Sequence, residues 1–407
     1  MTKNLYTLLF CLLSALVPIL AVDVPRGLAF APSVIGLVFY ILYFFVFGTK
    51  PQFTKKALWF VLTVLGLSAL SLTWAQNFDV SSEKVMKLSL LFPLQLLVIS
   101  LAVSLKKEAL DPYIHYFSYG VVIASLLLSF ELLSDGLLFN AIRNVPLDTV
   151  VPPAEFNRAS ILLSLYSFIA LTFLKARIKH RFYYLIILIP LFTALCLAES
   201  QSAQLSLIIG SVFLFFFPYK SKLAWRVLKI LILTSMVSAV FVTTYIYQNF
   251  ASDIQQAPML AQAYAGHRLE IWDFVSRYAL QQPLHGFGIE VTRSITDFDS
   301  VRIFNNSNLV LHPHNFALQI WIEFGLLGIF IAMVFMYKIL SMIQNNFTVQ
   351  QQKILLPTAM ATLTPAAFAF GMWQGWWIAV LFHLAAMSLI ATKFTDDANT
   401  VKEALHE

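Results

Sequence analysis

The sequence predicts an all-α polytopic membrane protein, with about 12 transmembrane helices in a single integral membrane domain over residues 1–407. Hydrophobic residues make up 59% of the 407 residues and charged residues only 12%, whereas a soluble domain carries about 25% charged residues. One crossing needs about 20 apolar residues, so this composition could supply roughly a dozen crossings. The two cysteines, Cys11 and Cys196, both lie in apolar stretches and provide no disulfide framework.

Twelve apolar stretches follow one another along the chain, and we expect a transmembrane helix in each. They cover residues 5–22, 28–47, 57–74, 88–105, 113–133, 159–174, 182–198, 203–217, 230–247, 316–337, 354–372 and 376–392. The first stretch could instead be a signal peptide, because Lys3 precedes it and Ala21 closes it. Against this, the segment is long and its cleavage site is poor.

The distribution of charge predicts the orientation of these helices. Basic residues cluster after the second, fourth, sixth and eighth stretches, at Lys50, Lys55, Lys56, Lys106, Lys107, Lys175, Arg177, Lys179, Arg181, Lys220, Lys222, Arg226 and Lys229. Such clusters mark cytoplasmic connections, so both termini, including a short tail at 393–407, are expected in the cytoplasm. The net charge of +6 therefore reflects topology, and no nucleic-acid partner is expected.

One connection is much longer than the others. Residues 248–311 join the ninth and tenth stretches on the non-cytoplasmic face, and loops of this length are usually functional. Within it, 266–282 reads as an amphipathic helix with Leu269, Trp272 and Val275 on one apolar stripe, and such a helix could lie along the membrane interface.

The first candidate site is His312-Pro313-His314-Asn315, where the long loop enters the tenth stretch. A neutral imidazole here could act as a general base near neutral pH. The alternative is an ordinary helix start, with Pro313 in the first turn and both imidazoles facing water. A metal site is less favoured because two histidines alone do not complete the three or four ligands of zinc.

Four further polar groups are expected on the same membrane face. Arg268 lies four residues before Trp272, so its guanidinium could rest on the indole or hold phosphate oxygens through its planar fork. Asn157 and Arg158 precede the sixth stretch, and Gln201 lies in the short turn between the seventh and eighth stretches. These groups could be solvated or snorkelling; alternatively they converge with His314 on one outward-facing cavity.

Two other features have simpler explanations. Asp297-Phe298-Asp299 resembles the spaced acidic pair with which many glycosyltransferases hold a divalent metal, but a solvated loop is favoured. Trp373, Trp376 and Trp377 fit an aromatic belt at the membrane interface.

Taken together, these motifs resemble the O-antigen ligase and polymerase superfamily of bacterial membrane glycosyltransferases. The resemblance covers roughly residues 157–377. It rests on the long outer loop, on Arg268-x-x-x-Trp272 leading to Pro283-x-x-Gly286-x-Gly288, and on His314-Asn315 followed by Leu318, Glu323, Gly325, Leu327 and Gly328.

The resemblance implies a fold related to type C glycosyltransferases and a location in the bacterial inner membrane with the active site facing the periplasm. It implies undecaprenyl-pyrophosphate-linked glycan as donor, lipid A-core as acceptor and membrane lipids as surroundings, with inversion and without metal or cofactor. His314 resembles the family's essential histidine. Arg268, Arg158, Gln201 and Asn315 are the expected donor-binding residues. One departure is the turn Ser200-Gln201-Ser202, where relatives commonly carry an arginine.

Two alternatives to ligation remain open at the level of sequence. A polymerase of O-antigen or exopolysaccharide repeat units would belong to the same family. A transporter or flippase also fits the number of stretches, but transporters usually show repeated halves with sites at the bilayer midplane, whereas the polar candidates here gather at one surface.

Overall fold

The protein is a bundle of helices in the computed structural model, which describes residues 1–178, 180, 182, 184–257, 265–295 and 311–395. Each of the twelve predicted stretches contains a helix, and the described residues include no strand. The twelve are α1 (Lys3–Asp23), α2 (Ala31–Phe47), α3 (Lys55–Leu70), α4 (Phe78–Ser104), α6 (His115–Leu133), α8 (Asn157–Arg177), α9 (Leu185–Leu197), α10 (Gln201–Phe216), α11 (Lys222–Gln256), α14 (Phe316–Asn346), α15 (Val349–Phe368) and α16 (Gly375–Thr392).

The all-α polytopic fold class is confirmed. Within the described ranges, nine segments are long and apolar enough to cross a membrane, and α9 and α10 are shorter apolar helices. Smaller helices connect them: α5 (Lys107–Leu110), α7 (Leu137–Arg143), α13 (Ala265–Ala279), and the 3-10 turns η1 (Pro25–Ala29), η2 (Ser71–Trp74), η3 (Pro153–Phe156) and η4 (Val291–Ser294). The number of twelve membrane crossings stays a prediction.

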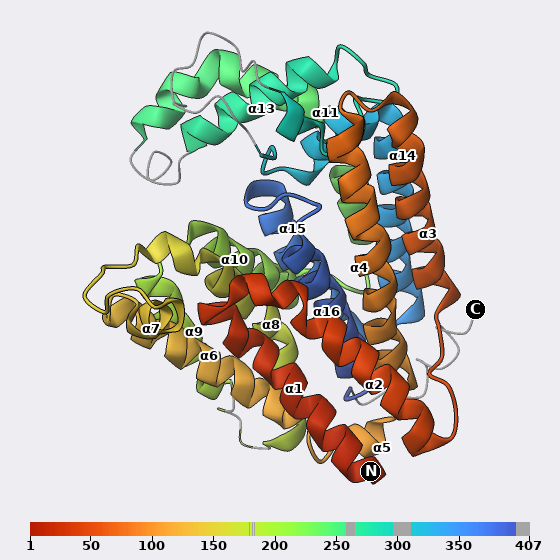
Figure 1. Ribbon diagram of the computed structural model, residues 1–407, viewed down its shortest axis with the longest axis vertical. Coiled ribbons are helices and arrows are strands. Elements are labelled where there is room, and N and C mark those ends of the chain that lie inside the picture. The colour runs from red at the N-terminus through yellow and green to blue at the C-terminus, as the bar shows by residue number, and fades with distance from the viewer. Residues whose placement is uncertain (179, 181, 183, 258–264, 296–310, 396–407) are drawn as a thin grey trace.

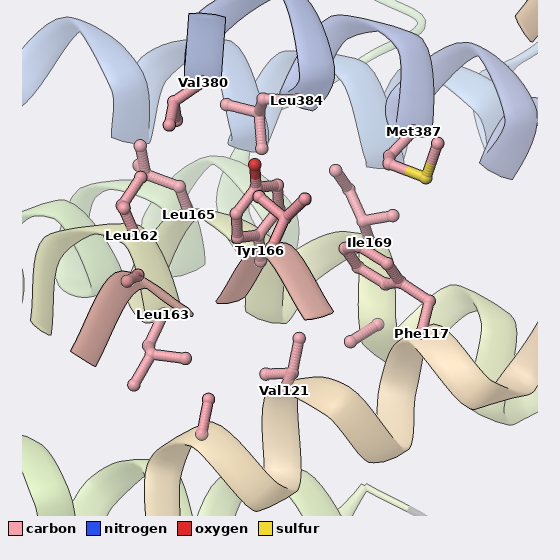
Figure 2. Close-up of a cluster of buried hydrophobic side chains, with 14 of the residues drawn as sticks. Phe117, Val121, Leu162, Leu163, Leu165, Tyr166, Ile169, Val380, Leu384 and Met387 are labelled. Atoms are coloured by element: carbon pink, nitrogen blue, oxygen red, sulfur yellow. The ribbon is translucent and has the colours of Figure 1, made fainter. Parts of the chain in front are cut away.

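The helices form two groups that share α15 and α16 (Figure 1). In the view of Figure 1, α3, α4 and α14 run side by side, α1, α6, α8, α9 and α10 gather opposite them, and α11 and α13 cover the upper end. The core of the first group includes Phe117, Tyr166, Leu384 and Met387, drawn in Figure 2. Within this core the Tyr166 hydroxyl lies 2.8 Å from Nδ1 of His383.

The helix α14 is broken near its middle. At Gly325 the backbone takes φ +55° and ψ −150°, a conformation that only glycine adopts without strain. The break leaves peptide groups of α14 without partners in their own helix, and the segment 283–288 supplies those partners. Four hydrogen bonds result: Phe287 N to Ile322 O (2.9 Å), Gly288 N to Glu323 O (2.9 Å), Leu326 N to Pro283 O (2.8 Å) and Leu327 N to Leu284 O (3.1 Å).

This contact explains the Pro283-x-x-Gly286-x-Gly288 motif. A Cβ atom on Gly286 would lie 2.6 Å from backbone atoms of 322–324, and one on Gly325 would lie 2.6 Å from the carbonyl oxygen of Pro283. The two backbones approach each other so closely that neither position has room for a side chain. The motif therefore fixes this part of the long loop to the broken helix, which begins directly after the His314 segment.

The predicted amphipathic helix 266–282 corresponds to α13, which is packed inside the protein rather than lying alone along the interface. Leu269 and Val275 of its apolar stripe are buried, but so are Asp273 and Ser276 on other faces. Ser276 Oγ lies 2.8 Å from Thr243 Oγ1 of α11. Because α13 contacts both α11 and α14, its orientation is fixed relative to α14.

Candidate functional site

His314 lies in a constrained backbone segment just before α14. Its φ of +55° falls in the left-handed region, which histidine tolerates better than branched residues do. On one side, the indole N–H of Trp272 in α13 donates to the carbonyl oxygen of Pro313 over 2.7 Å. On the other, Asn315 caps α14, its Oδ1 accepting from the N–H groups of Ala317 and Leu318. These contacts hold the imidazole in one place.

The hydrogen bonds of His314 define its tautomer. Nδ1 lies 2.7 Å from the carbonyl oxygen of Ala369, which follows α15. A carbonyl oxygen only accepts, so Nδ1 carries the proton, and in the neutral ring the lone pair remains on Nε2. This is the arrangement expected of a general base oriented by a backbone carbonyl.

The surroundings of His314 favour its neutral form. Burial lowers the pKa of the imidazole, and the positive charge of Arg268 lowers it further, while the hydrogen bond to Ala369 acts in the opposite direction. The imidazole of His314 and the guanidinium of Arg268 therefore lie within electrostatic range of each other, although the two residues belong to different elements.

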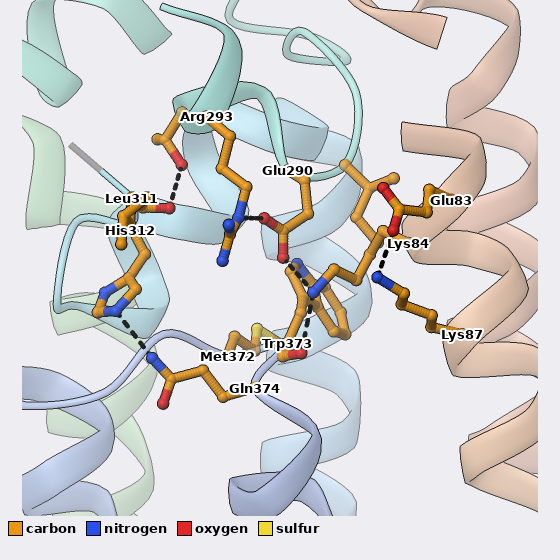
Figure 3. Close-up of polar contacts among 12 residues, drawn as sticks. Glu83, Lys84, Lys87, Glu290, Arg293, Leu311, His312, Met372, Trp373 and Gln374 are labelled. Atoms are coloured by element: carbon orange, nitrogen blue, oxygen red, sulfur yellow. Dashed lines mark hydrogen bonds and ion pairs between the residues drawn. The ribbon is translucent and has the colours of Figure 1, made fainter. Parts of the chain in front are cut away.

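A second imidazole packs against the first. The rings of His312 and His314 have centroids 4.2 Å apart. Gln374 accepts from the indole N–H of Trp376 over 2.9 Å through Oε1, so its Nε2 donates to Nε2 of His312 over 2.8 Å (Figure 3). Burial, together with the positive charges of Arg293 and Lys84, lowers the pKa of His312 to about 3, so this ring is neutral.

Three arginines lie at the same end of the bundle as this pair of histidines, and none has an ion-pair partner among the residues with described positions. Arg268 of α13 is half-buried. Arg158, at the start of α8, lies with its guanidinium carbon 5.5 Å from the ring centroid of Trp376. Arg26 of η1 lies near enough to Arg158 for the two positive charges to act on each other.

A series of contacts joins Arg158 to Trp376, Gln374, His312 and His314, and the charge of Arg268 acts on His314 at its end. The structure thus brings Arg158, Arg268 and His314 to the same end of the bundle. Gln201, the first residue of α10, begins its helix at that end too. Asn315 lies next to His314, and its side-chain oxygen is engaged in capping α14 rather than directed at a ligand.

Sequence reasoning missed two parts of this region. One is Arg26, because a lone arginine between the first two stretches resembles an ordinary loop charge. The other is an ion-pair cluster beside His312, in which Glu290 contacts Lys84 of α4 over 2.7 Å and also Arg293 of η4 (Figure 3). The only available signal was the position of these charges next to apolar stretches on the non-cytoplasmic side.

A buried carboxyl group forms hydrogen bonds that hold the segment carrying Trp373 in place. Glu323 of α14 is fully buried; its Oε1 accepts from Gln319 over 3.0 Å and its Oε2 accepts from the indole N–H of Trp373 over 2.5 Å. Gln319 in turn accepts from the N–H of Met372 over 2.8 Å. These bonds position residues 372–374, and therefore the Gln374 amide that contacts His312.

Two other expectations come out differently. Trp373, Trp376 and Trp377 are 5%, 7% and 2% exposed, so they pack inside the protein, and the interface belt is wrong for them. Asp297 and Asp299 lie outside the described residues. Within the described ranges, no three His, Cys, Asp or Glu side chains gather closely enough to hold a metal ion.

Comparisons with known proteins give one family. Residues 185–333 match the family model described as O-antigen ligase. A Rickettsia conorii protein named "putative polysaccharide ligase" is 26% identical over 277 residues, which cover 67% of this chain and 65% of the relative. Similarly named proteins of Rickettsia felis and Rickettsia bellii are 26% and 32% identical over 285 and 123 residues, covering 67% and 28% of this chain and 66% and 29% of the relatives. The chain thus spans just under two thirds of the length of the first two relatives.

Proposed function

Because the chain belongs to the O-antigen ligase superfamily, we propose that it transfers polysaccharide from undecaprenyl pyrophosphate to lipid A-core on the periplasmic face of the bacterial inner membrane. The relatives' names favour ligation over polymerisation of repeat units. The observation that carries the proposal is the geometry of His314. Its Nδ1 is bound to the carbonyl oxygen of Ala369, and Nε2 remains available as a base beside Arg268.

The proposed reaction is a direct displacement at the anomeric carbon of the donor sugar. An acceptor hydroxyl forms the new glycosidic C–O bond while the bond from the anomeric carbon to the pyrophosphate oxygen breaks, which inverts the configuration. The hydroxyl proton passes to Nε2 of His314, and the electron pair of the broken bond leaves with undecaprenyl pyrophosphate. No metal or cofactor takes part in this scheme.

The arginines would act on the leaving group. Negative charge builds up on the pyrophosphate as the bond breaks, so Arg268 accelerates the reaction if it binds the departing group more strongly than the intact donor. Proton transfer also places a cation on His314, beside Arg268, and the departing anion offsets that repulsion. Arg158 and Arg26 could supply the guanidinium contacts that the turn Ser200-Gln201-Ser202 lacks, with Gln201 as an uncharged hydrogen-bond donor.

The replacement His314→Asn tests the base. Asparagine tolerates the left-handed backbone of this position but cannot take up a proton at neutral pH, so the variant should insert and fold normally. Loss of a general base lowers rates by about 10²–10⁴-fold. We expect such a loss when purified protein in proteoliposomes is given lipid-linked glycan and lipid A-core.

The matched control is His180→Asn, because His180 is exposed and lies on the connection between α8 and α9, away from the site. Transfer by the His314 variant at the control rate would refute the assigned role.

The cellular phenotype separates the proposal from its rivals. In a host without the gene, polymer should accumulate on the undecaprenyl carrier while lipid A-core stays uncapped. Core capped by one repeat unit would identify a polymerase instead. Solute counterflow in proteoliposomes without sugar transfer would identify a transporter.

A further inference from the structure

At the end of the bundle opposite His314, the charged residues contributed by five helices and the turns beside them are all basic. Neither residues 200–252 nor residues 324–395 contain an aspartate or glutamate. These two segments include α10, nearly all of α11, the second half of α14, and α15 and α16. Their basic residues toward this end are Lys220, Lys222, Arg226, Lys229, Lys338, Lys353 and Lys393. These helices therefore place no carboxylate at this end that could pair with the basic side chains in place of a bound anion.

A hollow of about 560 Å³ lies among these charges. It lies where α10 ends, α11 begins and α15 begins, and its lining combines Lys220 and Lys353 with Ser221, Tyr219 and apolar side chains. Because α15 starts at this hollow and ends next to Ala369, which contacts His314, the length of α15 separates the hollow from the candidate active site.

The floor of the hollow is rigid. The hydroxyl of Tyr219 donates to the carbonyl oxygen of Phe213 over 2.7 Å, and the indole N–H of the buried Trp225 donates to the carbonyl oxygen of Tyr219 over 3.0 Å. The N–H of Ser221 closes a turn on Pro218 over 2.8 Å. A preformed hollow binds a ligand without first having to order the turn that lines it.

Phe215 lines the hollow, and other large exposed apolar side chains lie next to it along the chain. Phe215, Phe216 and Leu223 are 74%, 79% and 66% exposed, and they lie at the adjoining ends of α10 and α11. In a membrane these surfaces contact acyl chains. Two ammonium groups beside an apolar, lipid-facing wall match a molecule with an anionic head and hydrocarbon tails, and basic hollows between transmembrane helices are typical sites for such lipids.

We propose that this hollow binds an anionic phospholipid, with its phosphate between Lys220 and Lys353 and its acyl chains along Phe215 and Phe216. The bound lipid links α10, α11 and α15 at the end of the bundle remote from the sugar-transfer site. The site is independent of the proposed function, because it depends on none of the residues around His314.

Native mass spectrometry of the full chain tests the proposal. Protein purified in detergent is incubated with an equimolar mixture of phosphatidylglycerol and phosphatidylethanolamine, and the lipid that stays bound is identified. We expect preferential retention of phosphatidylglycerol, reduced in the double variant Lys220→Gln, Lys353→Gln. Each lysine near an anionic lipid contributes about 1 kcal/mol, so the double variant should bind roughly 25-fold more weakly.

The matched control is Lys50→Gln, Lys106→Gln, which removes two exposed lysines from the same end of the bundle but outside the hollow. Equal loss of phosphatidylglycerol in both double variants would overturn the proposal in favour of a general charge effect. Equal retention of the two lipids by the unmodified protein would also overturn it, as would displacement of the lipid by millimolar inorganic phosphate.

Discussion

At the scale of single residues, the candidate site depends on which ring nitrogens of the two histidines already take part in hydrogen bonds. The carbonyl oxygen of Ala369 accepts from Nδ1 of His314, and the Gln374 amide donates to Nε2 of His312, so the two adjacent imidazoles use different nitrogens for these bonds. Of the two rings, His314 is the one whose Nε2 has no hydrogen bond from the described part of the chain and whose pKa is lowered by the charge of Arg268. The sequence alone offers two equivalent histidines, His312 and His314. Their hydrogen bonds identify His314 as the proposed base.

The pH dependence of transfer follows from the same environment. Burial and Arg268 hold the pKa of His314 below its ordinary value of 6.5, and the base acts only when unprotonated. Activity should therefore fall only on the acid side of pH 6.5, as measured by kcat/KM across a pH series. The replacement Arg268→Gln removes a positive charge, which raises the pKa of His314. As the pH is lowered, the residual activity of this variant should therefore begin to fall at a higher pH than that of the unmodified protein. An unchanged acid limb would indicate that Arg268 and His314 do not interact.

The variant Arg268→Lys separates charge from geometry. Lysine keeps the positive charge but loses the planar fork that binds two phosphate oxygens at once. We expect transfer to fall by at least about tenfold, in line with the loss of one charge-assisted hydrogen bond worth about 1.5–3 kcal/mol. Proteoliposome turnover equal to that of the unmodified protein would exclude bidentate binding of the donor.

At the scale of elements, the broken α14 joins the loop motif to the histidine segment. Pro283 to Gly288 completes the hydrogen bonds that the break at Gly325 leaves open, and Asn315 starts the same helix at the other side of the site. Hydropathy alone predicts α14 as a single helix, because the apolar residues continue without interruption through Gly325. The break depends on a contact between residues about 40 positions apart, so it lies beyond what a local pattern can show.

The close approach of the two backbones makes a stability prediction. In Gly325→Ala the new methyl group would lie 2.6 Å from the carbonyl oxygen of Pro283, in a conformation that alanine disfavours. We expect a clear decrease in melting temperature in detergent, corresponding to about 2–4 kcal/mol.

The control for this stability prediction is Gly66→Ala. Gly66 lies within α3, and no atom lies within 4 Å of the position that a methyl group would take there. That variant should be neutral or slightly stabilised, since alanine favours helix more than glycine does. Equal melting temperatures for the two variants would show that the contact at Gly325 is not required.

At the scale of the whole molecule, the sequence predicts the positions of the helices well and the side-chain contacts between them poorly. Apolar stretches locate all twelve helices, because the cost of exposing polar peptide groups to lipid acts on each segment separately. Topology also predicts that Arg158, Arg268 and His314 share one end of the bundle. The pairs Lys84–Glu290 and Gln374–His312 join residues far apart in the sequence, and nothing local marks them. Likewise, aromatic composition does not reveal whether Trp376 faces lipid or protein.

The orientation of the bundle in the membrane can be tested directly. In a chain with Cys11→Ser and Cys196→Ser, single cysteines are introduced at Asp148, in the exposed connection between α7 and η3, and at Lys220, at the opposite end. The positive-inside rule predicts that a membrane-impermeant maleimide labels the first in whole spheroplasts and the second only after lysis. The reverse pattern would invert the predicted topology and move the candidate site to the cytoplasm.

The protein carries its own optical reporter of this region. Of its eight tryptophans, Trp272, Trp373, Trp376 and Trp377 lie within the contact series around the two histidines or directly beside it. Indole emission responds to nearby charge and to water. Arrival of a diphosphate at Arg158 or Arg268 should therefore change the intrinsic fluorescence, so donor binding can be followed in real time without a label and without turnover.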